Sequence, residues 1–352
     1  MLDFVYEALP SRVVFGVGSL DTLADEVERL GNRALVLATP PQREQAEDVA
    51  ARLGDRSAGV YDQAVMHVPI ETAQAARDEA QIVGADCCVA VGGGSTIGLG
   101  KAIALEFGLP IVAVPTTYAG SEMTPIWDLT QDGVKRTGRD PKVLPKTVVY
   151  DPTLTLTLPP QISGPSGMNA IAHCVEALYS ETANPIVSLM AEEGVRALGA
   201  SLPDVVARPD DLDARSDALY GAWLSGAALG AVGMAIHHKL CHTLGGSFNL
   251  PHAEVHTVVI PHAAAYNSAA APAAMARVAR ALGADDAPAA LYDLAERIGA
   301  PLALKDIGMA EAELDRAAEL ATTNPYYNPR PIERDAVRAL LDDAFHGRRP
   351  AA

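Results

Sequence analysis

Long apolar runs, disulfide-type cysteine spacing and excess positive charge are all missing from this sequence. No uninterrupted apolar run approaches the roughly 18 residues that cross a bilayer, and the first ten residues carry acids and lack the apolar core of a secretion signal. The cysteines form no C-x-x-C pair and fit reduced thiols; they are Cys87, Cys88, Cys174 and Cys241. These absences predict a soluble protein of the cytoplasm.

The formal net charge of -17 argues against partners that attract a basic surface. An acidic surface repels nucleic-acid backbones and anionic lipids, so we expect neither a nucleic-acid nor a membrane partner. A small acidic molecule can still bind where a few cations converge. An anionic substrate would therefore require a basic pocket.

A chain of 352 residues favours two domains, and two halves of different character are visible. In the first part, strand-like runs alternate with stretches of helical spacing. The strand-like runs are 33–38, 58–61, 87–91, 110–114 and 147–150, and the helical stretches are 23–30, 43–53 and 71–83. This alternation predicts βαβ units and a parallel sheet.

After the turn-rich residues 151–160 the sequence changes to long helical stretches rich in Ala and Leu. They include 167–180, 186–198, 212–231 and 272–282, and no convincing strand follows them. The predicted fold is therefore α/β, with a Rossmann-like parallel-sheet domain over residues 1–157 that binds a nucleotide. An all-helical domain over residues 158–352 would carry the substrate and the catalytic groups.

A glycine-rich run follows one predicted strand, where residues 90–96 read Ala-Val-Gly-Gly-Gly-Ser-Thr and lead into a helix. Consecutive glycines let backbone amides approach an anion, and the N-terminus of a helix favours negative charge. The predicted cofactor-binding residues here are Gly93, Gly94, Ser95 and Thr96. Because the spacing fits neither the G-x-G-x-x-G nor the P-loop pattern, a turn without a ligand is the alternative.

Two further predicted strands end in candidate cofactor-binding residues. Thr116 and Thr117 follow one strand, and ligands of open α/β sheets bind at the carboxyl ends of strands. Either hydroxyl could instead cap a helix. Thr39 follows another strand, and no acid is present there to hold a ribose 2′-hydroxyl, so we expect both NADH and NADPH to be used.

Polar residues recur at a spacing of four in the apolar helical half. Asn169 and His173 share one helix face by this spacing, as do His238 and His242, and His252 follows after a turn. We expect these five side chains to converge. For the other histidines we favour an ordinary core or surface position; they are His67, His237, His256, His262 and His346.

The order and spacing of these motifs resemble the iron-containing alcohol dehydrogenase family, from residues 15–18 to Arg330. The resemblance implies a dehydroquinate synthase-like fold, a homodimer, and a divalent metal held by one Asp and three His. The matching positions are Asn169, His173, His238 and His252, and His242 matches a further active-site histidine of the family.

Asn169 replaces the family's Asp, which removes the one anionic ligand of the metal. A neutral amide oxygen is a weaker ligand for a hard divalent cation. We therefore expect a metal-free enzyme with NADH or NADPH as its cofactor. A zinc site of three histidines is the alternative, since such sites occur in proteins.

The same Asn is typical of one subgroup of the family, as are Gly98 in place of a family Asp and the runs 118–125 and 324–331. This resemblance implies reduction of a keto-dicarboxylate whose carbon–carbon double bond is conjugated to the ketone, giving 3-oxoadipate in the breakdown of aromatic compounds. Hydride delivered to the alkene carbon would yield an enolate, which hydrogen-bond donors stabilise.

Within that reaction, our hypothesis assigns His242 as the proton donor. His173, His238 and His252 would shape the oxygen-binding pocket, and Asn169 would donate an amide hydrogen bond. The candidates for binding the dicarboxylate are Tyr326, Arg330, Lys142, Arg139 and Lys239. For Arg139 and Lys239 a solvated surface charge is slightly favoured, and a packing role is an equal alternative for Tyr326.

Three other functions stay open at this point. One is a metal-dependent alcohol or polyol dehydrogenase of the same family, and another is a dehydroquinate synthase-type enzyme; the missing metal carboxylate weighs against both. The third is a nucleotide-binding protein without catalysis, for which the convergent histidines would have no purpose.

Overall fold

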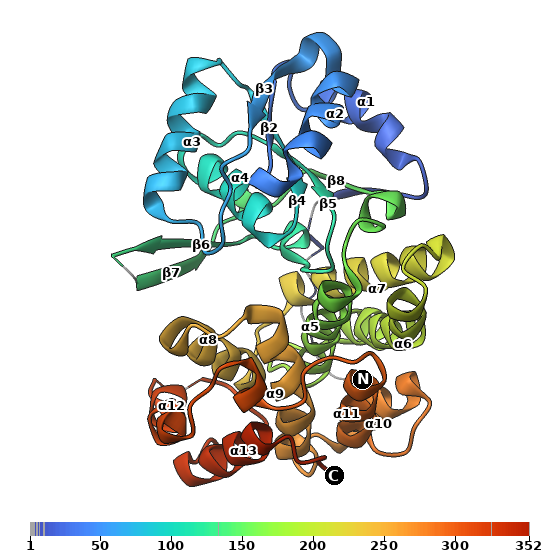
Figure 1. Ribbon diagram of the computed structural model, residues 1–352, viewed down its shortest axis with the longest axis vertical. Helices are drawn as coiled ribbons and strands as arrows, with labels where there is room; N and C mark the ends of the chain where they lie inside the picture. Colours follow the sequence, from blue (N-terminus) through green and yellow to red (C-terminus); the bar gives the residue numbers. More distant parts are fainter. Residues whose placement is uncertain are drawn as a thin grey trace. The chain divides into compact units, whose positions relative to one another are not determined.

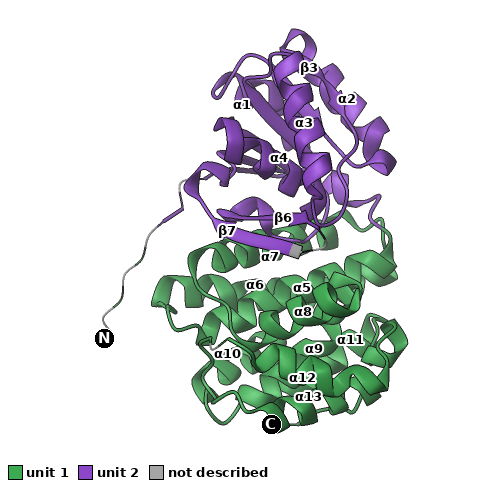
Figure 2. Cartoon of the chain, turned by 90° about the vertical axis from the view of Figure 1, so that its left-hand side faces the viewer, with its two compact units in different colours: residues 1–7, 159–352 green, residues 8–158 purple. Residues whose placement is uncertain are grey.

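The computed structural model describes residues 4, 6, 8, 9, 11–132, 134–324 and 326–351, and the chain divides into two compact units (Figure 2). We call Ala8–Leu158 the sheet unit, and Pro159–Ala352 with residues 1–7 the helical unit. The sequence analysis placed the boundary after residue 157, one residue earlier. Pro325, part of the predicted run 324–331, lies outside the described residues.

A six-stranded parallel sheet forms the centre of the sheet unit (Figure 1). Its strand order is β1-β8-β5-β4-β2-β3. The strands are β1 (Arg12–Phe15), β2 (Ala34–Leu37), β3 (Ser57–Tyr61), β4 (Cys87–Gly92), β5 (Ile111–Pro115) and β8 (Thr147–Tyr150). This parallel sheet confirms the predicted fold class.

Helices cover both faces of this sheet, which explains why its central strands are apolar without alternation. Val36 of β2 packs in a cluster with residues of α1 and α2, whereas Leu35 and Leu37 pack with residues of α3 and α4. The helices are α1 (Leu23–Glu28), α2 (Arg43–Leu53), α3 (Ile70–Ile82) and α4 (Gly94–Phe107). The side chains of one strand thus build two separate cores.

Three strands of the sheet unit were not predicted from the sequence. They are β1, which pairs with β8, and the antiparallel hairpin of β6 (Ile126–Gln131) and β7 (Val134–Arg139). The hairpin strands are half-buried or exposed and carry many polar residues, so their hydrophobic pattern is weak. Asp132 and the glycine after it form the dipeptide typical of hairpin turns, and this was the available signal.

Helices make up the regular structure of the helical unit (Figure 1). They are α5 (Pro160–Tyr179), α6 (Pro185–Ala207), α7 (Leu212–Ala231), α8 (Ile236–Phe248), α9 (His252–Asn267), α10 (Pro272–Leu282), α11 (Ala287–Arg297), α12 (Leu314–Thr322) and α13 (Arg334–His346). One core cluster joins residues of α8, α9, α12 and α13. This all-helical architecture also agrees with the predicted fold class.

The helix that was predicted to end near residue 198 continues to Ala207 as α6. Gly199 does not end it, because that glycine serves close packing: a Cβ added there would lie 2.5 Å from Leu282 Cδ2. The start of α6 is capped as its sequence suggests, since Asn184 Oδ1 accepts hydrogen bonds from two backbone amides of the first turn.

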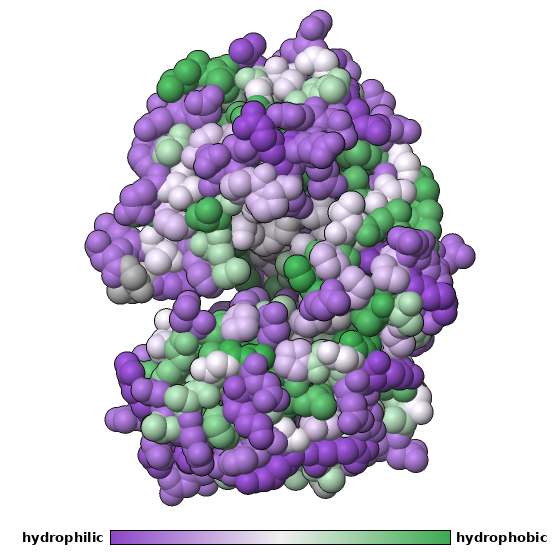
Figure 3. All heavy atoms as spheres, in the orientation of Figure 1, coloured by the Kyte–Doolittle hydropathy of each residue, from purple (hydrophilic) through white to green (hydrophobic). Residues whose placement is uncertain are grey.

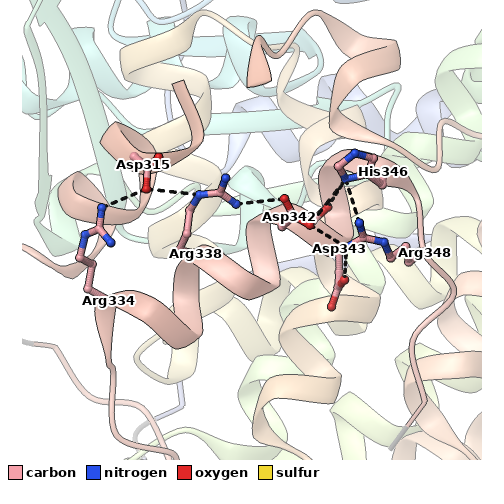
Figure 4. Close-up of polar contacts among 7 residues, drawn as sticks. All are labelled: Asp315, Arg334, Arg338, Asp342, Asp343, His346 and Arg348. Carbon is pink, nitrogen blue, oxygen red and sulfur yellow. Dashed lines mark hydrogen bonds and ion pairs between the residues drawn. The ribbon is translucent and has the colours of Figure 1, made fainter. Parts of the chain in front are cut away.

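Hydrophilic residues cover much of the face of the helical unit seen in Figure 3. In Figure 4, Arg338 of α13 lies between Asp315 of α12 and Asp342, at nitrogen–oxygen distances of 3.4 Å and 3.2 Å. Arg348 extends the network to Asp343 at 2.7 Å. These ion pairs are partly exposed, so each contributes little to stability.

Helix length and composition were also compared with the requirements of a membrane span. Among the described residues, no single helix is long and apolar enough to cross a membrane. Only α7 and α8 taken together meet the length and composition requirements, and they are bent by 97° at the break between them.

Candidate active site

The glycine run of the sheet unit forms a turn that leaves no room for a side chain at Gly92 or Gly93. Gly92 has a φ of +146°, and a Cβ added to it would lie 2.6 Å from Thr96 Oγ1 and 2.7 Å from Gln42 Oε1. A Cβ on Gly93 would lie 2.9 Å from Thr117 Oγ1. The structure therefore brings the glycine run and the loop after β5 into close contact, as the cofactor-site prediction requires.

Side-chain hydrogen bonds through Gln42 join the ends of strands β2 and β5 at this edge of the sheet. Thr39, after β2, donates through its hydroxyl to Gln42 Oε1 at 2.9 Å. Gln42 Nε2 donates to Thr116 Oγ1, after β5, also at 2.9 Å. Gln42 was not predicted, because one Gln at the start of a helix gives no sequence signal. These contacts place two predicted residues, Thr39 and Thr116, together and leave their binding of a cofactor as a prediction.

The first turn of α4 supplies the donors that an anion would need. No side chain caps this helix, which begins directly at Gly94. Helix N-terminal amides without partners bind phosphate groups well. The Thr96 hydroxyl, fully buried beside Gly92, also has no hydrogen-bond partner. Ser95 is half-buried in the same turn.

A buried lysine ties α4 to the loop after β5. Lys101 Nζ donates to the carbonyl oxygens of Ser121 and Ile126, each at 2.7 Å, and to Thr124 Oγ1 at 3.0 Å. Burial lowers the pKa of Lys101 to about 7. The two loops predicted to hold the cofactor are thereby connected through one side chain.

The position where the family usually has Asp is filled by a neighbouring side chain. A Cβ added to Gly98 would lie 2.8 Å from Val68 Cγ2. Val68 itself has a positive φ of 41°, which is unusual for a β-branched residue. The loop before α3 thus occupies the space that Gly98 leaves open.

A cluster of histidines forms in the helical unit where α5, α8 and α9 pack together (Figure 1). His173 of α5 and His238 of α8 stack with ring centroids 5.1 Å apart. The His242 ring lies 6.1 Å from that of His238. Helix α9 begins at His252, whose ring lies 4.4 Å from that of His256. The predicted histidines are therefore brought into one region.

Two further histidines belong to this cluster, although the sequence analysis favoured ordinary positions for both. His237 and His256 are fully buried, and His237 Nε2 lies 2.9 Å from His256 Nδ1. Cys241 Sγ lies 3.6 Å from His237 Nε2, so the potential ligand atoms of all three residues lie within 4.8 Å of one another. The short contact between the two rings is that of a hydrogen-bonded pair, which we take to be their role.

Buried atoms without partners mark the centre of the cluster. Asn169 Oδ1, His173 Nδ1, His238 Nε2 and His256 Nε2 all lack a hydrogen-bond partner. Leaving such a buried group unsatisfied costs about 1–3 kcal/mol. In contrast, the side chains of His242 and His252 are exposed. This concentration of unsatisfied lone pairs indicates a binding site for a species that accepts them.

Burial keeps the inner imidazoles neutral. The pKa of His173 lies well below its ordinary value, chiefly because burial disfavours the charged form and secondarily because His238 is close. Burial lowers the pKa values of His237 and His256 in the same way. Neutral imidazole is the form of histidine that binds a metal ion.

The predicted substrate-binding residues lie in both units. Tyr326 is half-buried, its hydroxyl has no hydrogen-bond partner, and Lys239 Nζ lies 5.7 Å from its ring centroid. The Arg330 guanidinium stacks 4.1 Å above the ring of Tyr266. Lys142 and Arg139 are exposed in the sheet unit, Lys142 in the short helix η5 (Pro141–Val143) and Arg139 at the end of β7.

Comparison with known proteins shows the family of this chain. The model of the iron-containing alcohol dehydrogenases matches residues 10–152, and that of the C-terminal region of the same family matches residues 164–345. The chain therefore belongs to the iron-containing alcohol dehydrogenase family and is an oxidoreductase.

Its relatives include maleylacetate reductases. The maleylacetate reductase of Burkholderia cepacia is 62% identical over 352 residues, which cover 100% of both chains. The crystal structure of maleylacetate reductase from Agrobacterium tumefaciens is 54% identical, with a TM-score of 0.97 over 99% of this chain and 100% of that one. An iron-containing alcohol dehydrogenase from Corynebacterium glutamicum is 45% identical, with a TM-score of 0.95 over 99% of this chain and 98% of that one.

The expectation of a metal-free enzyme is wrong. Family membership implies iron or another divalent metal in addition to NAD(P)H, and the 45% identical Corynebacterium structure is itself described as iron-containing. The error came from giving the replacement of Asp by Asn169 too much weight. Three imidazoles alone are a sufficient set of ligands for a divalent ion such as zinc.

The residues present fit such an ion. By match of motif it would be held by Asn169, His173, His238 and His252. The buried, partnerless atoms of the first three are the kind of donors that a cation satisfies. The carboxylate of Glu176 contacts His238 Nδ1, on the other side of the ring from Nε2, and adds negative charge close to the site.

Proposed function

We propose that this protein is a maleylacetate reductase, which uses NADH or NADPH to reduce the carbon–carbon double bond of 2-maleylacetate to give 3-oxoadipate. The observation that carries the proposal is the 62% identity to the Burkholderia cepacia maleylacetate reductase over the whole of both chains. The Agrobacterium tumefaciens structure of the same description supports it. This reaction belongs to the breakdown of aromatic compounds.

In this proposal the sheet unit binds the dinucleotide. Backbone amides of the first turn of α4, with Gly93 and Gly94, hold the diphosphate, and the hydroxyls of Thr96 and Thr117 line the same turn. Thr39 lies where a ribose-binding acid would stand in an enzyme specific for NADH. Because no carboxylate occupies that position, both cofactors are accepted.

The helical unit orients the keto-dicarboxylate and handles the proton. Hydride from the reduced nicotinamide forms a new C–H bond at the alkene carbon, and the electron pair of the double bond moves toward the ketone oxygen as an enolate. A bound divalent ion supplies a Lewis acid that stabilises negative charge on oxygen. His242, one helical turn beyond His238 and exposed, donates the proton that completes 3-oxoadipate.

Two cationic groups and one hydroxyl are available for the substrate carboxylates in the helical unit. Burial, and then the negative charge of Glu176, raises the pKa of Tyr326, so its hydroxyl remains a hydrogen-bond donor. Lys239 lies over the ring of Tyr326, and Arg330 lies over the ring of Tyr266. We assign the two cations and Tyr326 to carboxylate recognition, and Lys142 remains a predicted substrate-binding residue of the sheet unit.

The assay is the oxidation of NADH or NADPH by the purified protein with maleylacetate, before and after loading with Fe²⁺ or Zn²⁺. We expect oxidation of both cofactors and formation of 3-oxoadipate in equal amount. A metal-loaded protein that oxidises neither cofactor in the presence of maleylacetate would contradict the proposal.

The role of His242 is tested by His242→Ala. Loss of a general acid typically costs about 100-fold or more in rate, so turnover should fall by that order while NADH affinity stays unchanged. His346→Ala, at an exposed histidine of α13, is the matched control. Unchanged turnover in His242→Ala would remove this residue as the proton donor.

A metal-dependent alcohol or polyol dehydrogenase is the second candidate, supported by the 45% identity to the Corynebacterium glutamicum structure. It predicts reduction of NAD by simple alcohols in the metal-loaded protein.

We further propose a homodimer in the cytoplasm. The four buried, unpaired cysteines are compatible with a reducing compartment, and light scattering of the purified protein would test the dimer.

A further inference from the structure

A fully buried carboxylate lies directly behind the histidine cluster. Glu176 follows Asn169 by seven residues and His173 by three on α5, so all three side chains lie on one helix face. The side chain of Glu176 is 0% exposed. Its Oε2 lies 2.6 Å from His238 Nδ1, a short and strong contact.

The same carboxylate binds the beginning of α8. Its oxygens accept hydrogen bonds from the backbone amides of Ala235 at 2.9 Å, His237 at 2.8 Å and His238 at 3.3 Å. The Tyr179 hydroxyl donates a further bond at 3.3 Å. All these partners are donors, which is the environment of an ionised carboxylate. The backbone amides at the start of a helix also favour negative charge.

This arrangement determines which nitrogen of His238 carries the proton. Because Nδ1 faces an acceptor, it bears the hydrogen, and the lone pair lies on Nε2. Nε2 is one of the buried atoms without a partner. Glu176 also holds the backbone amide of His238, so both the ring and the start of its helix are fixed by one group.

We propose that Glu176 is a positioning residue: it orients His238, fixes its tautomer so that Nε2 is presented to the divalent ion, and supplies the negative charge that Asn169 does not. Carboxylates that bind the far nitrogen of a metal-binding histidine commonly have this effect. The inference rests on the family's metal and deepens the proposed function. It explains how a site with a neutral Asn still binds a cation.

The first test is the affinity for Zn²⁺, measured by competition with a chelator. Glu176→Gln keeps the size of the side chain but replaces one acceptor by a donor, and should weaken Zn²⁺ binding by about 10- to 100-fold. NADH affinity, a property of the sheet unit, should be unchanged, and the helix signal in circular dichroism shows whether the helical unit of the variant is folded. Wild-type Zn²⁺ affinity in Glu176→Gln would overturn the proposal.

Tyr179→Phe is the matched control for this experiment. It removes one donor to the same carboxylate but leaves the contact with His238 intact. We therefore expect its Zn²⁺ affinity to stay near that of the wild type. An equal loss in Tyr179→Phe and Glu176→Gln would show that general packing, not the contact with His238, is responsible, and would overturn the proposed role.

A second test does not depend on the folding of any carboxylate variant. Nitrogen-15 NMR of the histidine rings in the metal-free wild type, with the His238 signals assigned by their loss in His238→Gln, reports which nitrogen is protonated. We expect a proton on Nδ1 and none on Nε2. A proton on Nε2 with a bare Nδ1 would overturn the proposal.

Failure of the proposed function can be told apart from failure of this inference, because neither measurement needs maleylacetate. If the wild type does not reduce maleylacetate but Glu176→Gln loses Zn²⁺ affinity, the substrate assignment fails and the role of Glu176 stands. If the wild type reduces maleylacetate while Glu176→Gln binds Zn²⁺ normally, only the role of Glu176 fails.

Discussion

The two candidate sites of this protein are built from different parts of the chain. In the sheet unit the site consists of backbone amides and hydroxyls around Gly92 and Gly93, where side chains would collide. In the helical unit it consists of buried imidazoles and a carboxylate. Some of the imidazole nitrogens have no hydrogen-bond partner, and the carboxylate of Glu176 contacts His238. The first site should therefore be sensitive to added atoms, and the second to changes of charge and protonation.

The largest effect should follow from adding one carbon to the sheet-unit site. Gly92→Ala forces a side chain into a positive φ and against Thr96 and Gln42, so we expect a loss of about 3 kcal/mol or more in unfolding free energy. Urea unfolding followed by circular dichroism measures it. NADH affinity should fall as well.

Gly94→Ala is the control for this prediction. A Cβ there would meet Ala119 Cβ only at 4.0 Å, which is ordinary contact. Its unfolding free energy should stay close to that of the wild type. Equal destabilisation by both changes would contradict the view that internal crowding at Gly92 is the cause.

In the helical unit, a change of charge without a change of size should act most strongly. Asn169→Asp returns the family's carboxylate, and we expect Zn²⁺ to bind more tightly by about tenfold or more, since an anionic oxygen is the stronger ligand. The chelator competition assay measures this. Weaker binding would mean that the amide oxygen of Asn169 does not face the ion.

Acid should destabilise the helical unit through a buried histidine outside the cluster. Burial lowers the pKa of His262 to about 4, and its Nε2 has no partner. Because the folded-state pKa is depressed, its contribution to stability is complete above the unfolded value near 6.5 and is lost as the pH falls toward 4. Between pH 7 and pH 5 this amounts to about 2 kcal/mol.

The measurement is the unfolding free energy of the metal-free protein against that of His262→Gln at several pH values. As the pH falls through this window, the unfolding free energy of the wild type should decrease more than that of His262→Gln. Parallel curves would show that His262 does not titrate abnormally in the folded state.

The smallest effect should come from the surface of the same unit. Arg338→Ala breaks the ion pairs with Asp315 and Asp342 drawn in Figure 4, yet we expect a loss of only about 1 kcal/mol or less because these pairs are partly exposed. Thermal unfolding in low and high salt measures it. A loss as large as that of Gly92→Ala would erase the contrast between the crowded interior of the sheet unit and the exposed surface of the helical unit.

Much of the fold could be predicted because it follows from short-range patterns. The buried strands β2, β4 and β5 are continuous apolar runs, and α2, α7 and α10 have the predicted bounds. The β6–β7 hairpin was missed because neither of its strands contributes a regular apolar face to a core. Pattern reasoning fails where burial is partial.

The candidate sites were predictable only where spacing along the helix carries the information. Asn169 and His173 are visible from their separation of four residues. The pair of His237 and His256 is not, since their positions differ by 19 and only the packing of α8 on α9 brings them together. Glu176 has no sequence signal that sets it apart from other helical Glu residues, because its contact with His238 arises from the packing of α8 against α5.

The packing of Val68 against Gly98 restricts which substitutions position 98 can accept. An Asp introduced at position 98, as most of the family has, would meet the methyl group of Val68 before it reached any ligand. The loop that carries Val68 would have to be rebuilt first. An engineer who wishes to introduce Asp at position 98 should therefore alter residue 68 first, because Gly98→Asp alone would crowd the side chain of Val68.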